Sequence, residues 1–238
     1  MTAPEGAAQA DCLHATAAQL LTEWAVYGRY YRARIGPGPD APIEDLRDRL
    51  EIAPHGWPLA EVDAREPDLL VIMMNPGASR PLKALWDGDS PAGLVPAQPD
   101  RTQYQIMRLM RAAQAAGLPW RHARVFNLSD LRTPKSAEML AKLDWYGPHD
   151  SHSLFSEGRK VECTRWFAHH ATPVLCGWGL NPDLSQWAAR ALRAAAGHPL
   201  LGLSDDGLRF RHPLPQTQSL QQQWLQAMVD QIGAIPRT

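Results

Sequence analysis

The chain has 238 residues, a formal net charge of −1 and 45% hydrophobic residues, which suits one soluble domain and excludes a protein that binds polyanions by its bulk charge. No apolar run approaches membrane-spanning length, and the N-terminus lacks the basic start and apolar core of a secretory signal. Cys12, Cys163 and Cys176 are too scattered for a disulfide framework or a zinc ribbon. We therefore expect a cytoplasmic protein with no membrane partner and no metal.

Residues 1–66 are predicted to form a helical and irregular segment that packs on the core. Apolar residues recur at helical spacing from Leu13, and we expect that helix to run to about Arg34. Its last residues, RYYRAR, suit nucleic-acid contact by charge and stacking, and equally suit packing on the domain. Gly and Pro in IGPGPDAP break the helix, and residues 43–66 are expected to be an irregular layer with one short helix.

Four apolar segments in residues 67–238 predict buried strands. The clearest is LLVIMMN, bounded by turn signals on both sides. Helical patterns fall over residues 104–116, 158–171, 183–196 and 219–232. Because strands alternate with helices, we predict an α/β domain of three layers, α/β/α, with a central, mostly parallel four-stranded sheet. The four strand segments cover residues 69–75, 123–131, 172–179 and 200–213.

Polar residues gather where these strands end. The first strand runs into Asn75, the second contains Asn127, and the fourth has His212 at its end. Ligands of parallel sheets bind at the carboxyl ends of the strands, so we expect these three side chains to converge on one crevice. Two amides and an imidazole can orient a water molecule, read a donor–acceptor edge and stabilise a leaving anion.

Four motifs, in chain order, resemble those of the uracil-DNA glycosylase superfamily, above all its mismatch-specific branch. IMMNPGAS looks like the first motif, in which Asn-Pro-Gly follows the first strand. VFNLSDL is similar to the second-strand segment, PVLCGWG to the third, and RHPLPQTQS to the closing His-Pro-x-Pro motif. Residues 68–216 also resemble a bacterial and phage family of unknown function with the same succession of Asn-Pro, Asn-Leu, Trp-Gly and His-Pro.

The resemblance implies a role for each matching residue. Asn75 would position the attacking water, Asn127 would bind the edge of a flipped base, and His212 would donate a hydrogen bond to a base oxygen as the ring departs. The remaining base pocket would comprise Pro76, Gly77, Phe126 and Trp178. The residues implied in DNA binding are Ser79, Arg80, Arg101, Arg132, Arg211, Pro213, Pro215, Thr217 and Ser219.

The chain departs from the family pattern in three places. Asn75 stands where the best-known branch has an Asp, and Leu214 separates the closing prolines where a small residue is usual. No clear aromatic residue follows the first motif to stack on the base, which leaves Trp86 and Phe126 as candidates. These departures leave the substrate open.

Structural explanations stand beside each functional one. Asn-Pro is common turn chemistry, and Asn127 can serve to tie down a neighbouring loop. Residues 101–135 carry seven cations against Asp130 alone, which suits either phosphate contact or a solvated helix face. His149, His152, His169 and His170 have no known zinc spacing. The loop GPHDSHS is expected to lie over the crevice, where Asp150 and His152 would contribute.

The sequence therefore predicts a monofunctional DNA glycosylase without metal or organic cofactor. It would hydrolyse the N-glycosidic bond of a damaged, mismatched or modified base, in DNA repair or in phage defence. We expect a monomer in which residues 67–238 form the glycosylase-like domain. Two alternatives remain: an enzyme on the same fold that processes free nucleosides or nucleotides, and a non-catalytic protein that binds a base or DNA.

Overall fold

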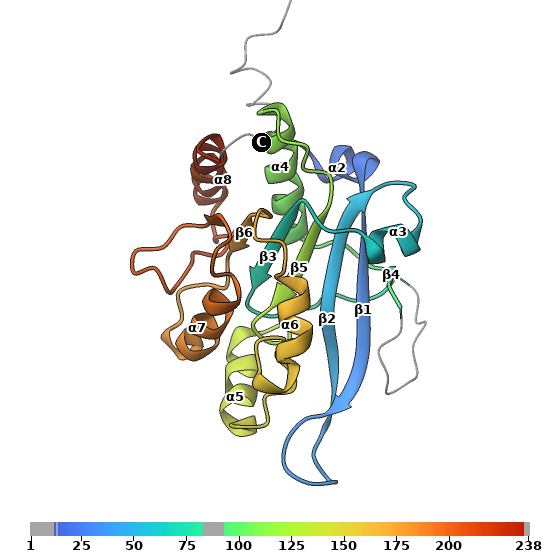
Figure 1. The fold of residues 1–238 in the computed structure, drawn as a ribbon, viewed down its shortest axis with the longest axis vertical. Coiled ribbons are helices and arrows are strands. Elements are labelled where there is room, and N and C mark those ends of the chain that lie inside the picture. Colours follow the sequence, from blue (N-terminus) through green and yellow to red (C-terminus); the bar gives the residue numbers. More distant parts are fainter. Residues whose placement is uncertain (1–11, 13, 83–92, 236–238) are drawn as a thin grey trace, which may run out of the picture.

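The computed structural model describes residues 12, 14–82 and 93–235 (Figure 1). The elements in chain order are α2 (Ala17–Glu23), β1 (Trp24–Arg34), β2 (Ile43–Pro54), α3 (Leu59–Ala64), β3 (Leu69–Met73), β4 (Val95–Pro96), α4 (Arg101–Ala115), β5 (Ala123–Asn127), α5 (Ser136–Tyr146), α6 (Lys160–Trp166), β6 (Val174–Cys176), α7 (Ser185–Ala194), β7 (Leu200–Leu201) and α8 (Gln218–Gly233).

The sheet is mixed and has the strand order β4-β1-β2-β5-β3-β6-β7. Strands β5, β3, β6 and β7 are parallel to one another, whereas β4, β1 and β2 pair antiparallel and β2 joins the parallel part through β5. The predicted α/β class is confirmed. The prediction of a four-stranded, mostly parallel sheet is wrong, because the N-terminal segment adds a long antiparallel hairpin and most paired residues are antiparallel.

The helix expected up to Arg34 ends at Glu23, and the chain continues as strand β1. Burial alternates along β1: Trp24, Val26, Gly28 and Tyr30 are buried and the residues that alternate with them are partly exposed, which is the two-residue period of a strand. The helical and irregular character expected for residues 1–66 is therefore wrong for β1 and β2. The apolar positions before Trp24 fit a helix, and the change of period falls at that residue.

Strand β2 was not predicted from the sequence, because it contains charged residues that are usually exposed. Its residues from Leu46 to Pro54 are all buried, yet Arg47, Asp48, Arg49 and Glu51 are among them. Glu51 is wholly buried and accepts from Arg124 Nε at 2.6 Å and lies 2.7 Å from His122 Nε2. A buried charge is tolerated when it is paired, so an ionic strand can lie at the centre of a sheet.

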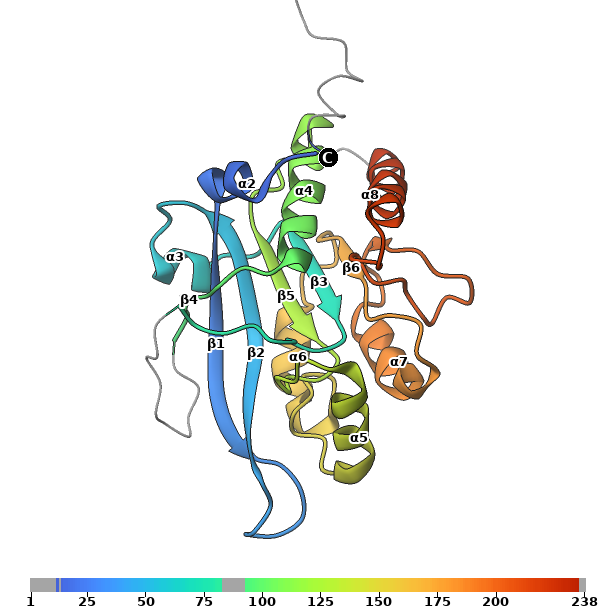
Figure 2. The same ribbon diagram turned by 180° about the vertical axis from the view of Figure 1, so that it is seen from behind.

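Helices cover both faces of the sheet (Figures 1 and 2). Alternate residues of β3 separate two cores. Val71 packs in the core that includes residues of α2, α4 and α8, and Ile72 packs in the core that includes residues of α5, α6 and α7. The four predicted helices and the first three predicted strands of residues 67–238 are found in the structure, and α5 was not predicted from the sequence. The fourth strand, expected over residues 200–213, is reduced to Leu200–Leu201. The polar strand ends are thus held between two apolar layers.

Candidate active site at the carboxyl ends of the strands

Asn75 lies two residues beyond β3 with its side chain held by the loop that follows β5. Its Nδ2 donates to the carbonyl of Thr133 at 2.9 Å, to Thr133 Oγ1 at 3.1 Å and to the carbonyl of Leu131 at 3.3 Å. Since these acceptors fix the amide nitrogen, the orientation of the planar amide is set, and Oδ1 is directed away from them as an acceptor. The side chain is partly exposed, so Oδ1 can orient a water molecule.

His212 is fixed by its own loop. The backbone N–H of Leu214 donates to His212 Nδ1 at 3.0 Å, so the proton of the neutral ring lies on Nε2. Burial lowers the pKa of His212, and the nearby carboxylate of Asp100 opposes this shift. The neutral ring is therefore favoured at pH 7. It presents an Nε2–H donor, which has no hydrogen-bond partner among the described residues.

Gly177, directly after β6, brings the histidine loop against the strand ends. A Cβ atom at this position would lie 2.8 Å from Pro213 Cδ and 3.2 Å from Met73 Sδ. Only a residue without a side chain leaves room for so close an approach. Because Met73 ends β3 and Pro213 follows His212, the packing places Asn75 and His212 at the same edge of the sheet. We therefore group these two predicted residues in one candidate site.

Asn127 is at this edge too, but its amide is engaged within the protein. The side chain is fully buried. Its amide satisfies both neighbours when the nitrogen donates to the backbone carbonyl of Asn75 at 3.2 Å and the oxygen accepts from Arg47 Nη2 at 3.3 Å. This geometry fits the loop-tying role that the sequence left open. It gives no support to base reading by Asn127 and makes the residue a positioning group for Asn75.

Arg47 is a buried group that the sequence prediction missed. Its guanidinium is 2% exposed, and neither Nε nor Nη1 has a hydrogen-bond partner among the described residues. Burial lowers its pKa, which the charges of Tyr30, Asp100 and Asp130 oppose. The only signal in the sequence was a cation inside a strand, and that strand was itself not predicted.

Ser79 and Arg132, both predicted to bind DNA, hold the loop after β3. Ser79 is buried, with Oγ 3.1 Å from Tyr30 Oη, and its carbonyl accepts from Arg132 Nε at 2.7 Å. The Arg132 guanidinium also lies over the Tyr30 ring, 5.3 Å from its centroid. Their polar groups are largely used in this internal contact.

Two predicted base-pocket residues lie in the core. Phe126 is buried, with its ring centroid 5.8 Å from Trp166 and 6.0 Å from Phe167. Trp178 is also buried; its Nε1 donates to the Leu208 carbonyl at 3.1 Å. Both rings are occupied by packing, so stacking on a base is not supported for either. Pro76 is buried, Gly77 has a left-handed φ of 61°, and Trp86 lies outside the described residues.

The remaining residues predicted to contact DNA differ in exposure and in the partners they already have. Arg80, Arg101 and Arg211 are exposed, although Arg211 pairs with Asp205 at 2.9 Å. Thr217 Oγ1 caps α8 by accepting from the Leu220 N–H at 3.3 Å. Of the other three, Pro213 is buried, Pro215 is partly buried and Ser219 is exposed.

Residues 101–135 do not form one basic face. Arg124 is buried and pairs with Glu51, Arg111 pairs with Glu23 at 3.5 Å, and Lys135 pairs with Glu138 at 3.2 Å. The RYYRAR segment is likewise used in packing within β1, where Arg29 pairs with Asp48 and Tyr31 donates to Asp130 at 3.2 Å. The structural explanation fits both stretches better than a continuous phosphate track.

Two side chains of the GPHDSHS loop, His152 and Asp150, are engaged in contacts within the protein. His152 is buried between the rings of Trp187 and Tyr146, with centroid distances of 5.2 and 5.8 Å, and Asp150 pairs with Arg190 at 2.6 Å. In the part of the chain that the structure describes, His, Cys, Asp and Glu form no group able to hold a metal ion. Within the same residues, none of the helices combines the length and apolar character needed to cross a membrane.

Comparison with known proteins identifies no relative: no family model, no curated protein and no solved structure matches the chain.

Proposed function

We propose that the protein hydrolyses the N-glycosidic bond of a damaged, mismatched or modified base in DNA. The observation that carries the proposal is the Leu214 N–H donated to His212 Nδ1, which leaves an oriented Nε2–H donor on a neutral ring. Asn75 supports it from the same edge with an amide oxygen that is held as an acceptor. An acceptor for water and a donor for a departing anion are the two groups that this reaction requires.

The chemistry assigned to each group follows from its polarity. Asn75 Oδ1 accepts a hydrogen bond from a water molecule and directs the water oxygen towards the sugar carbon that bears the base. As the bond from this oxygen to the carbon forms, the bond to the base breaks, and the proton lost by the water reaches the released base through solvent. The bonding electrons leave with the base, and His212 Nε2–H donates a hydrogen bond to the base oxygen on which negative charge builds. A neutral imidazole suits this role, because it donates without transferring its proton completely. Asn127 acts indirectly, by holding the backbone of Asn75.

The test is an assay for abasic sites. Labelled oligonucleotides carrying uracil, hypoxanthine, xanthine, mismatches or hydroxymethylated or glucosylated cytosine are incubated with protein and cleaved with alkali. We expect cleavage at one of these bases and a loss of roughly 100-fold or more in Asn75→Ala and His212→Ala. The matched controls are Asn181→Ala and His55→Ala, at exposed or partly exposed positions outside the site. Full activity in both site variants would contradict the proposal.

A second candidate is an enzyme that cleaves free nucleosides or nucleotides. The dispersal of the cations of residues 101–135 favours it, because most of them are paired or packed internally. The two candidates separate when the same protein is offered deoxynucleosides and base release is followed by chromatography. Release from the free compounds alone would select this candidate, and DNA binding without any release would select a non-catalytic binding protein.

A further inference from the structure

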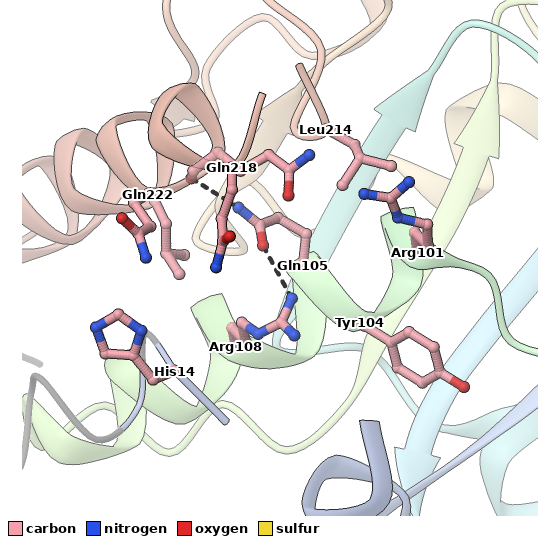
Figure 3. Close-up of a pocket in the computed structure, with 10 residues that line it drawn as sticks. His14, Arg101, Tyr104, Gln105, Arg108, Leu214, Gln218 and Gln222 are labelled. Carbon is pink, nitrogen blue, oxygen red and sulfur yellow. Dashed lines mark hydrogen bonds between the residues drawn. The ribbon is translucent and has the colours of Figure 1, made fainter. Parts of the chain in front are cut away.

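A hollow of about 300 Å³ lies between α4 and α8, beside the loop that carries His212 (Figure 3). The described residues that line it are mostly polar, and none of them is Asp or Glu: His14, Arg101, Tyr104, Gln105, Arg108, Leu214, Gln218, Gln221, Gln222 and Leu225. Helix α4 supplies one wall and the first turns of α8 the other. Figure 3 shows side chains of both helices directed towards the space between them.

The two arginines of the hollow have no carboxylate partner in the part of the chain that the structure describes. Among the described residues, neither Arg101 nor Arg108 forms an ion pair. Arg108 is positioned by Nε donating to the Ala15 carbonyl at 2.9 Å and by Nη1 donating to Gln105 Oε1 at 3.2 Å. Burial lowers the pKa of Arg108. A partly buried guanidinium in a fixed position, with no carboxylate to balance it, attracts an anion.

Hydrogen bonds connect the lining of the hollow to the loop that carries His212. Gln105 Nε2 donates to the Gln221 carbonyl at 2.9 Å, and Gln221 Nε2 donates to the Pro215 carbonyl at 2.8 Å. Pro215 lies three residues after His212, and Leu214, whose N–H fixes the histidine ring, lines the hollow itself. An anion in the hollow would therefore be bound next to the segment that orients His212.

We propose that this hollow binds a phosphodiester group of the DNA strand whose base enters the strand-end site, with Arg101 and Arg108 as its charged donors. The inference rests on the proposed function, since it assigns the hollow to the same substrate. Guanidinium groups match phosphate oxygens in geometry, and the amides of Gln218 and Gln222 supply neutral donors at the rim. The free phosphate of a nucleotide shares this chemistry, so the two sources must be distinguished.

The test measures binding apart from catalysis. Fluorescence anisotropy of a short labelled single strand carrying an abasic analogue is followed over a series of salt concentrations, with wild type, Arg101→Gln, Arg108→Gln and Arg108→Lys. Arg193→Gln is the matched control, since Arg193 is an exposed arginine of α7 on the opposite face of the sheet. Thermal melting checks that each variant is folded. If Arg108→Gln is unfolded, the test rests on Arg101→Gln alone. Arg101 is exposed and makes no hydrogen bond within the described residues, so its replacement should not disturb the fold.

We expect each glutamine variant to weaken binding about tenfold and to reduce the slope of log K against log salt by about 0.7, the effect of one lost phosphate contact. Arg108→Lys should keep the slope, and Arg193→Gln should match wild type. This result supports the site even if no base is released, in which case only the proposed function fails. Unchanged affinity and slope in both glutamine variants would overturn the site, even in an active glycosylase.

A parallel titration with deoxynucleoside monophosphates and with inorganic phosphate identifies the source of the anion. Binding of the oligonucleotide far tighter than of either small anion, with the losses described above, supports the phosphodiester. Binding of a monophosphate that is lost in the Arg101 and Arg108 variants, with no binding of the oligonucleotide, would overturn the assignment to DNA.

Discussion

Leu214 donates its backbone N–H to Nδ1 of His212 at 3.0 Å, so the His-Pro-Leu-Pro segment fixes the tautomer of its own histidine. The bond needs Nδ1 unprotonated, and burial lowers the pKa of the ring. We therefore expect ¹⁵N NMR at pH 7 to show a neutral His212 with its proton on Nε2 and an apparent pKa below the ordinary value of about 6.5. His212→Gln identifies the resonance. A ring protonated at pH 7 would contradict this prediction.

The pH dependence of the activity should follow the titration of His212. If a neutral His212 donates to the departing base, kcat/KM falls as the pH drops through the lowered pKa of His212, because protonation breaks the bond from Leu214. The rate should be level from there to neutral pH. His212→Gln, which keeps a neutral donor, should retain partial activity without this acidic limb, whereas His212→Ala should not.

Gly177→Ala should damage the site more than the fold. The added Cβ would lie 2.8 Å from Pro213 Cδ, and a proline ring has no flexible end that can give way. We expect a loss of about 1–3 kcal/mol in stability from overpacking and a loss of activity approaching 100-fold from displacement of the His212 loop. Urea denaturation and the abasic-site assay measure the two effects. Gly158→Ala, with open space around its Cβ, should change neither.

Asn75→Asp should weaken the protein, although an Asp at this position is what the best-known glycosylase branch carries. Asn75 Nδ2 donates to the carbonyls of Leu131 and Thr133, and a carboxylate would place an acceptor against those acceptors. The lost bonds and the unsatisfied carbonyls should cost about 1–3 kcal/mol in urea denaturation. In the matched control Asn181→Asp the side-chain oxygen still accepts from the Asp183 N–H, so its stability should stay within about 0.5 kcal/mol. Equal stability in both variants would contradict the assigned amide geometry.

The parallel part of the fold was predictable because its strands form short, mostly apolar runs bounded by turn signals. The composition of LLVIMMN and ARVFN is enough to predict β3 and β5. The parallel direction of the strands then predicts that the polar residues at their ends lie at one edge of the sheet. Strand β2 was not predictable in this way, because its buried carboxylate Glu51 is balanced by His122 and Arg124, which are more than 70 residues away. Long-range ion pairing leaves no periodic pattern in the sequence.

The site was predicted in position better than in detail. The sequence placed Asn75 and His212 at one edge, since both lie at the ends of predicted strands, and Gly177 shows why the neighbouring Pro213 and Met73 can approach. It gave Asn127 and Phe126 roles that need free polar or aromatic surface, which depends on the side chains packed around them. Arg47 went unnoticed because only the tertiary structure reveals that it is buried and that its Nε and Nη1 have no hydrogen-bond partner among the described residues.

His152 should make the protein less stable in mild acid. The ring is buried between Trp187 and Tyr146, and burial lowers its pKa to about 4. The unfolded chain has the ordinary value of about 6.5, so between pH 6.5 and 4 the unfolded state binds a proton that the folded state does not. The contribution of His152 to stability is fully present above pH 6.5 and is lost as the pH falls towards 4, at up to about 1.4 kcal/mol per unit.

The comparison of His152→Phe with wild type isolates this contribution. Phenylalanine can fill the space between the two rings but does not titrate, so the difference in unfolding free energy between the two proteins should shrink or reverse as the pH falls from 6.5 to 4. His55→Gln, at an exposed position, should follow the wild-type curve throughout. If the His152→Phe curve runs parallel to wild type across this range, the folded protein admits the proton, and the ring is less enclosed than its ring contacts and its contact with Ser129 Oγ at 3.1 Å indicate.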